Sequence, residues 1–83
     1  MLTIQYFASV REQLGRAGEE MALPDGAETV ADLIDVLQSR GAPWSLLSDQ
    51  QQVLVAVDQA VADRGHRLAG NEEIAFFPPM TGG

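Results

Sequence analysis

Apolar and polar side chains alternate in two short segments, one near each end of the chain. Residues 2–6 read LTIQY and residues 73–77 read EIAFF, so every second side chain is apolar. This period of two is typical of a strand that buries one of its faces. In the second segment the alternation places Ile74 and Phe76 on the core face and leaves Phe77 pointing away from it.

A helical period occurs in the first half of the chain. The apolar residues that are spaced three and four positions apart, and so share one face of a helix, are Val30, Leu33, Ile34 and Leu37. Thr29 is a favourable N-cap residue, Gly41 favours a helix end, and Pro43 prevents the helix from resuming. We therefore expect one main helix over residues 30–40.

The remaining apolar segments predict further strands and short turns. Residues 19–23 can form a strand antiparallel to the first, and residues 61–62 form a weak strand. Residues 52–57 are apolar on both faces, which favours a central position in the sheet. A short helical turn is expected at residues 9–14, and the single tryptophan, Trp44, is expected to pack against the core instead of binding a ligand.

The order of these elements is strand, strand, helix, strand, a possible short strand, and strand. A hairpin, a crossing helix and a returning strand describe an α+β protein whose mixed sheet carries one main helix on one face. The β-grasp, or ubiquitin-like, fold is the natural candidate, and in it the first and last strands lie side by side at the centre of the sheet. Phe7 lies out of phase with the first strand, so Phe7 and Phe77 would then form an exposed apolar patch, a common mark of an interaction surface.

Composition limits the chemistry that this chain can perform by itself. Its 83 residues suffice for a single domain, residues 1–83, and they include no cysteine. Disulfides, thiolate metal ligands and cysteine nucleophiles are therefore excluded. We expect no metal site, because the one histidine, His66, lies in a glycine-containing loop. Neighbouring acids such as Glu19 and Glu20 would point to opposite faces of a strand and so could not form an acid–base pair.

The charge balance is strongly acidic, with a formal net charge of −7 at pH 7. Nucleic-acid binding depends mainly on cationic side chains, so we expect no nucleic-acid partner. No apolar run approaches membrane-spanning length and no signal-peptide pattern begins the chain, which predicts no membrane association and a cytoplasmic location. All of the basic residues except the histidine are arginines, so no lysine is present through which copies of the chain could be joined by isopeptide bonds.

The carboxyl-terminal residues are the strongest candidates for a functional segment. After the last expected strand come Pro78 and Pro79, which favour extended backbone. The chain then ends in Thr81, Gly82 and Gly83. Two terminal glycines leave the carboxylate accessible from any direction, so a narrow pocket of another protein could admit it. We expect residues 78–83 to form an extended tail that reaches roughly 20 Å from the sheet.

Three stretches of the sequence resemble the small subunit of molybdopterin synthase, a family of ubiquitin-like sulfur carriers. They are residues 6–12 (YFASVRE), 53–57 (VLVAV) and 74–83 (IAFFPPMTGG), and the resemblance covers nearly the whole chain. The double proline before the terminal Gly-Gly points to this branch over the sulfur carriers of thiamine synthesis.

This resemblance implies a function for the terminus. Gly83 would be adenylated by an ATP-dependent enzyme of the ubiquitin-activating type, and a sulfur donor protein would displace AMP to leave a thiocarboxylate. The tail would then enter the large subunit of the synthase, in a heterotetramer, where sulfur passes to cyclic pyranopterin monophosphate to form the dithiolene of molybdopterin. The chain would hold no cofactor permanently and would not be catalytic alone.

The residues implied to contact these partners lie at or near the tail. Gly83 would carry the acyl group and Gly82 would provide clearance. The expected partner-binding residues are Phe7, Phe77, Pro78, Pro79, Met80 and Thr81. Two alternatives remain open at this point: a sulfur carrier for another pathway, such as that of thiamine or of a thio-amino acid, and a ubiquitin-like modifier or interaction module.

Overall fold

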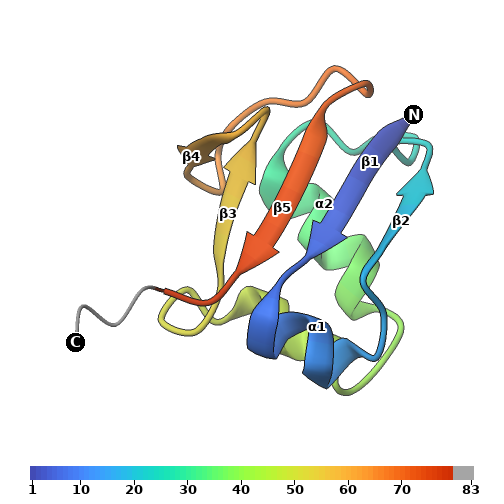
Figure 1. Cartoon of the computed structure of the whole chain (residues 1–83). Coiled ribbons are helices and arrows are strands. Elements are labelled where there is room, and N and C mark those ends of the chain that lie inside the picture. The colour runs from blue at the N-terminus through green and yellow to red at the C-terminus, as the bar shows by residue number, and fades with distance from the viewer. Residues whose placement is uncertain (80–83) are drawn as a thin grey trace.

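A mixed sheet and the helices on one side of it make up the computed structural model of the chain, which describes residues 1–79 (Figure 1). The elements in chain order are β1 (Leu2–Tyr6), α1 (Ala8–Leu14), β2 (Gly18–Met21), α2 (Val30–Gln38), the 3₁₀ helix η1 (Trp44–Ser48), β3 (Leu54–Val57), β4 (Ala60–Ala62) and β5 (Glu73–Phe77). In these residues, no helix is long and apolar enough to span a bilayer.

The sheet has the strand order β2-β1-β5-β3-β4. Its central pair, β1 and β5, is parallel and places Ile4 beside Ile74 and Tyr6 beside Phe76. The other neighbours, β1 with β2, β5 with β3, and β3 with β4, are antiparallel. The first and last strands therefore lie side by side in the middle of the sheet, as the sequence predicts (Figure 1).

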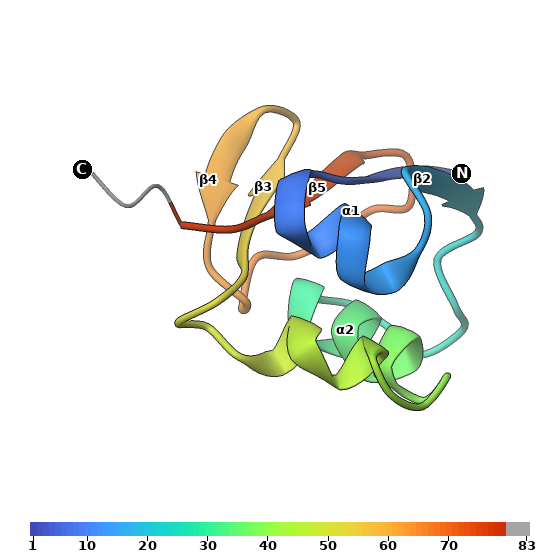
Figure 2. The ribbon, with the colours of Figure 1, turned by 60° about the horizontal axis from the view of Figure 1, so that its bottom comes forward.

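Helix α2 crosses one face of this sheet, and α1 lies on the same side (Figure 2). The four apolar residues that define its predicted face are all buried: Val30, Leu33, Ile34 and Leu37. They pack in one core with the inward residues of the strands, which include Leu2, Ile4, Tyr6, Val55, Ile74 and Phe76. No helix of residues 1–79 covers the other face of the sheet (Figure 2).

The start of α2 is fixed by the capping interaction that its sequence predicts. The Thr29 hydroxyl accepts a hydrogen bond from the Asp32 N–H at 3.2 Å, and the Asp32 carboxylate accepts from the Thr29 N–H at 3.1 Å. The same carboxylate also accepts from the Glu28 N–H at 2.8 Å, and these bonds to backbone donors lower the pKa of Asp32. The helix begins one residue after Thr29, where the sequence places it.

Several predicted boundaries differ from the observed ones. The prediction extends β2 to residue 23, but it ends at Met21, which pairs with Leu2, the first residue of β1. Strand β3 begins at Leu54 instead of residue 52, because the Asp49 carbonyl accepts hydrogen bonds from the N–H groups of residues 52 and 53 in a turn. Helix α2 ends at Gln38, two residues before its predicted end.

Trp44 is buried, as predicted, and its packing brings polar groups with it. Its ring meets the Tyr6 ring edge-on, with centroids 5.6 Å apart. The Arg40 guanidinium lies over the Trp44 ring at 4.4 Å from the centroid, in a cation–π contact. The contact between the Trp44 and Tyr6 rings ties the segment after α2 to the inner side of the sheet.

Candidate docking face and carboxyl-terminal tail

The face of the sheet that the helices leave open carries an apolar row at one end. Phe77 on β5 pairs with Leu54 on β3, and the Phe7 N–H donates to the Phe76 carbonyl at 3.0 Å, which continues the β1–β5 pairing by one step. Phe7, Phe77 and Leu54, here called the outer apolar row, thus follow one another across three strands. Phe7 is 45% exposed, and the other two are half-buried. The two rings of the predicted patch therefore occupy neighbouring positions on the open face, with Phe7 exposed and Phe77 half-buried, and their role in binding a partner stays a prediction.

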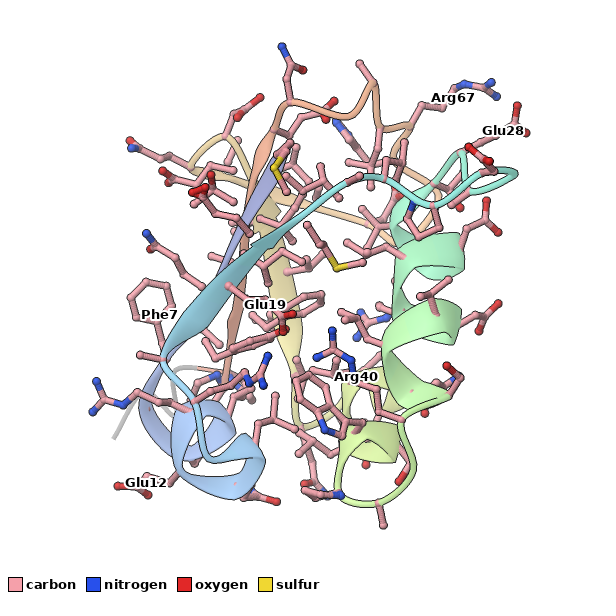
Figure 3. The ribbon with its side chains drawn as sticks, turned by 90° about the vertical axis from the view of Figure 1, so that its right-hand side faces the viewer. Phe7, Glu12, Glu19, Glu28, Arg40 and Arg67 are labelled. Carbon is pink, nitrogen blue, oxygen red and sulfur yellow. The ribbon has the colours of Figure 1, made fainter. Side chains whose placement is uncertain are left out.

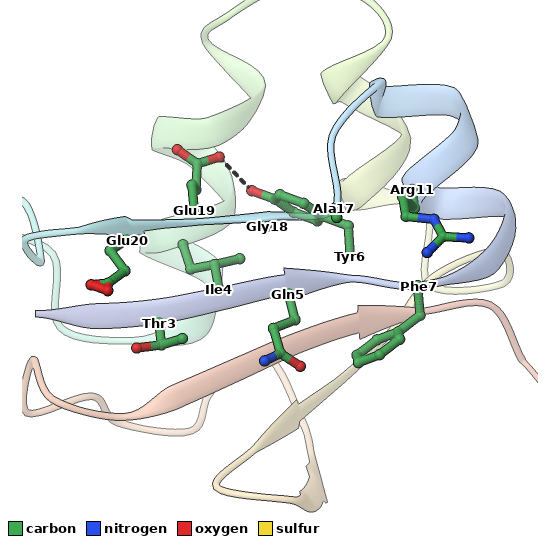
Figure 4. Close-up of a pocket in the computed structure, with 10 residues that line it drawn as sticks. All are labelled: Thr3, Ile4, Gln5, Tyr6, Phe7, Arg11, Ala17, Gly18, Glu19 and Glu20. Atoms are coloured by element: carbon green, nitrogen blue, oxygen red, sulfur yellow. Dashed lines mark hydrogen bonds between the residues drawn. The ribbon is translucent and has the colours of Figure 1, made fainter.

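Phe7 owes its position to the turn from β1 into α1. Its own backbone is extended, but Ala8 has φ 51°, in the left-handed region that non-glycine residues adopt at a cost on the order of 1 kcal/mol. The Phe7 carbonyl accepts from the N–H groups of Val10 and Arg11, which starts the helix. With both its N–H and its carbonyl bonded, Phe7 is fixed with its ring on the open face, the same face that carries Gln5 and Thr3 (Figure 4).

The tail starts at the same end of the sheet. Strand β5 ends at Phe77, and Pro78 and Pro79 lead the chain out of the sheet from there (Figure 1). Both prolines are half-buried. The four remaining residues for which we predict roles, Met80, Thr81, Gly82 and Gly83, lie outside the described residues. The structure therefore brings the base of the predicted tail next to Phe7 and Phe77.

On the opposite, inner side of β1 and β2 lies a polar cluster that sequence reasoning missed. The Glu19 carboxylate accepts from the Tyr6 hydroxyl at 2.8 Å and takes two hydrogen bonds from the Arg40 guanidinium, each at 2.8 Å (Figures 3 and 4). Arg16 adds an ion pair to the same carboxylate at 3.1 Å. We call Tyr6, Arg16, Glu19 and Arg40 the Glu19 cluster. It ties the edge strand β2 to the segment that follows α2.

The electrostatics of the Glu19 cluster follow from its burial and its charges. Hydrogen bonds from Arg40 hold the pKa of Glu19 at about 2, well below its usual 4.5. Burial, together with the bond to Glu19, raises the pKa of the Tyr6 hydroxyl above its usual value. The Glu19 side chain is only 14% exposed, so this paired carboxylate is shielded from water. The cluster therefore acts as a structural link, and its carboxylate stays ionised near neutral pH.

A shallow groove lies where β1, β2 and the start of α1 meet, on the side of the outer apolar row (Figure 4). Gly18 faces Gln5 across the two strands, and a Cβ at this position would lie 2.6 Å from the Ile4 carbonyl oxygen, so glycine lets β2 lie close against β1. Phe7 and Arg11 line one end, and Glu20 lines the other.

The described residues contain few groups suited to catalysis. In residues 1–79 no group of three or more His, Asp or Glu side chains could hold a metal ion. His66 is exposed in its loop, and Glu19 and Glu20 point to opposite faces of β2, as the alternation predicts (Figure 4).

A five-stranded mixed sheet with one main helix across one face defines a ubiquitin-like β-grasp protein. Solved structures share this fold. A protein described as molybdopterin converting factor, subunit 1, from Pyrococcus furiosus matches with a TM-score of 0.78 and 27% identity, over 95% of this chain and 97% of the other. SAMP1 from Haloferax volcanii matches with a TM-score of 0.74 and 25% identity, over 99% and 98% of the two chains. The predicted fold is confirmed.

The chain belongs to the ThiS family, whose model matches residues 4–83. Its curated relatives include the molybdopterin synthase sulfur carrier subunit of Escherichia coli (strain K12), which is 35% identical over the full length of both chains. The subunit of the same name from Mycobacterium tuberculosis (strain ATCC 25618 / H37Rv) is 31% identical, over 99% of this chain and 96% of the relative. The resemblance to molybdopterin synthase small subunits is therefore confirmed along the whole chain.

Proposed function

We propose that this chain is the sulfur carrier subunit of a molybdopterin synthase. The observation that carries the proposal is where β5 ends: its last residue, Phe77, belongs to the outer apolar row on the face that no helix of residues 1–79 covers, and Pro78 and Pro79 follow directly. The full-length similarity to sulfur carrier subunits of this synthase supports the same assignment. A large catalytic subunit is the partner that this role requires.

The chemistry of the proposed role follows from the terminal carboxylate. A carboxylate reacts poorly with nucleophiles, because its charge repels them and oxide is a poor leaving group. An activating enzyme therefore uses ATP to convert the Gly83 carboxylate into an acyl adenylate and releases pyrophosphate. A sulfur donor protein then displaces AMP, and Gly83 carries a thiocarboxylate. Gly82, which has no side chain, gives this group the clearance to enter a narrow pocket.

Sulfur delivery takes place in the large subunit. The thiocarboxylate of Gly83 transfers its sulfur to cyclic pyranopterin monophosphate, and two such deliveries complete one dithiolene. In this role, the outer apolar row docks the domain while Pro78, Pro79, Met80 and Thr81 fit the entrance to the large subunit. We propose that two carriers and two large subunits assemble into a heterotetramer, with the catalytic groups supplied by the large subunit.

Deleting Gly83 tests the proposal. The thiocarboxylated full-length chain, mixed with the large subunit and cyclic pyranopterin monophosphate, should yield molybdopterin, whereas the chain that ends at Gly82 should yield none. The truncated chain should keep the thermal unfolding midpoint of the full-length chain, because the core lies in residues 2–76. Full activity of the truncated chain, or of a chain capped as a terminal amide, would contradict the proposal.

Intact-mass measurement distinguishes this role from that of a protein modifier. Chain purified from its native host should include molecules that are heavier by the difference in mass between sulfur and oxygen. If the chain is found only in amide linkage to other proteins, it is a modifier. If the thiocarboxylate donates sulfur to a thiamine or thio-amino acid precursor but not to the pyranopterin, it is a carrier for another pathway.

A further inference from the structure

On the open face of the sheet, the side chains change from apolar, at the end where β5 leads into the tail, to acidic at the opposite end of the strands. Beyond the outer apolar row, the next row of outward residues consists of Gln5, Ala75, Ala56 and Val61, which follow one another across β1, β5, β3 and β4. The two central members are alanines, and Val61 at the edge is exposed. Two residues further, Thr3 pairs with Glu20 on one side and with Glu73 on the other. We call Glu20, Thr3 and Glu73 the acidic row.

Strand geometry gives the separation of these rows. Residues two apart on one strand are separated by about 6.6 Å, so the acidic row lies about 13 Å from the outer apolar row. Glu20 and Glu73 stand two strands apart, which is about 10 Å at the usual spacing of strands. Asp58 extends the acidic row, because its carboxylate accepts a hydrogen bond from the Glu73 N–H at 3.0 Å. The face thus has an apolar end and an acidic end at a fixed distance.

The chain's own cations do not neutralise the acidic end. Among residues 1–79, ion pairs involve only two acids, Glu19 and Glu28. Arg16 and Arg40 bind Glu19 on the inner side of the sheet, and Arg67 binds Glu28. Arg64 donates to two backbone carbonyls. Glu20 and Asp58 are exposed and Glu73 is half-buried, so these carboxylates are available to a partner.

The residues between the outer apolar row and the acidic row leave room for one partner to contact both rows. Ala75 and Ala56 project little from the sheet, and Gly18 beside Gln5 has no side chain. A protein that contacts the outer apolar row can therefore lie flat over the small residues and meet the acidic row as well. The acidic row is continuous with the docking face at the base of the tail, so a single interface would include both.

We propose that the acidic row is the electrostatic half of the docking face and that the large subunit of the synthase meets it with arginine or lysine side chains. The matching surface would combine an apolar socket for Phe7 and Phe77 with cations about 13 Å away. Opposite charges at such a rim speed association and fix orientation, and they suppress partners of the wrong charge. This inference rests on the proposed function for the identity of the partner.

Association kinetics test this inference with a matched pair of double variants. Glu20→Gln/Glu73→Gln removes two charges from the acidic row, and Asp25→Asn/Asp35→Asn removes two exposed charges that lie on none of the strands. Binding of each full-length variant to the immobilised large subunit is measured at low and at high salt. We expect the acidic-row variant to associate roughly tenfold more slowly at low salt, with the difference shrinking at high salt.

The control double variant should change the association rate less than about twofold, because its charges lie away from the interface. Equal association rates and equal salt dependence for the two double variants would overturn the inference while leaving the proposed function in place. If the wild-type chain fails to bind the large subunit at all, both proposals fail.

A variant of the outer apolar row separates the apolar contribution to binding from the electrostatic one. Phe7→Ala should speed dissociation from the large subunit and leave the salt dependence of the association rate unchanged.

Discussion

Neighbouring residues on the strands of this protein lie on opposite faces of the sheet and differ in burial and in bonding. Phe76 is fully buried under the helices, whereas Phe77 lies on the open face. Glu19 binds two arginines and a tyrosine on the inner side, whereas Glu20 is exposed on the outer side without an ion pair among residues 1–79. The inner face thus satisfies its apolar and polar groups within the chain, and the outer face leaves both kinds of group for a partner.

The largest expected difference between the faces lies in the phenylalanine pair. Phe76→Ala should lower the free energy of unfolding by about 3–5 kcal/mol, because it removes a buried ring that stacks on Tyr6. Phe77→Ala should cost only about 1 kcal/mol in stability and weaken binding to the large subunit by tenfold or more. Urea denaturation and a binding titration measure the two effects. Equal losses of stability in Phe76→Ala and Phe77→Ala would contradict the difference in burial between the two faces.

The glutamate pair should differ less, and its inner member should show a pH signature. Glu19→Gln should lower the free energy of unfolding at pH 7 by about 1–3 kcal/mol, whereas Glu20→Gln should change it by less than about 0.5 kcal/mol. The pKa of Glu19 is lowered from 4.5 to about 2 in the folded protein. Its contribution is therefore fully present above pH 4.5 and is lost as the pH falls through about 2.

Urea denaturation of wild type and of Glu19→Gln between neutral and acidic pH measures this contribution. The two stability curves should converge as the pH falls below 4.5, since protonation of Glu19 weakens its bonds to Arg40. A constant gap at every pH would assign the loss to packing instead of charge. Glu20→Gln serves as the matched control on the other face of the same strand.

Small changes in the free energy of unfolding are expected when a single hydroxyl group is removed from Tyr6 or added to Phe7. Tyr6→Phe removes the hydroxyl that donates to Glu19 and should cost about 0.5–1.5 kcal/mol. Phe7→Tyr adds a hydroxyl on the exposed face and should change the free energy of unfolding by less than about 0.5 kcal/mol. Thermal unfolding followed by circular dichroism is sensitive enough to separate them. A larger loss for Phe7→Tyr would mean that the Phe7 ring is part of the core.

Local patterns were sufficient to predict most of the fold. The period of two in residues 2–6 and 73–77, and the helical spacing of Val30, Leu33 and Leu37, correctly predicted which residues are buried. Boundaries were less predictable, because they depend on partners distant in sequence. Strand β2 ends at the residue that pairs with the start of β1, and this cannot be inferred from residues 19–23 alone.

The polar contacts of the Glu19 cluster were even less predictable from local sequence than the strand boundaries. Tyr6 and Glu19 are 13 residues apart, and Glu19 and Arg40 are 21 residues apart. No periodicity in the sequence connects them. Phe7 was different, since its position out of phase with β1 already marked it as an outward residue. The terminal residues Thr81, Gly82 and Gly83 stand out by their small size alone, whereas Met80 and the roles of all four come from the family resemblance and remain predictions.

The two prolines after β5 have a consequence for any complex that this protein forms. Proline has no backbone N–H, so neither Pro78 nor Pro79 can donate to a neighbouring strand. Each of the two ladders that flank β5 therefore loses a possible donor directly after Phe77, whatever protein is bound. Because the covalent structure of proline removes these donors, no partner can restore them.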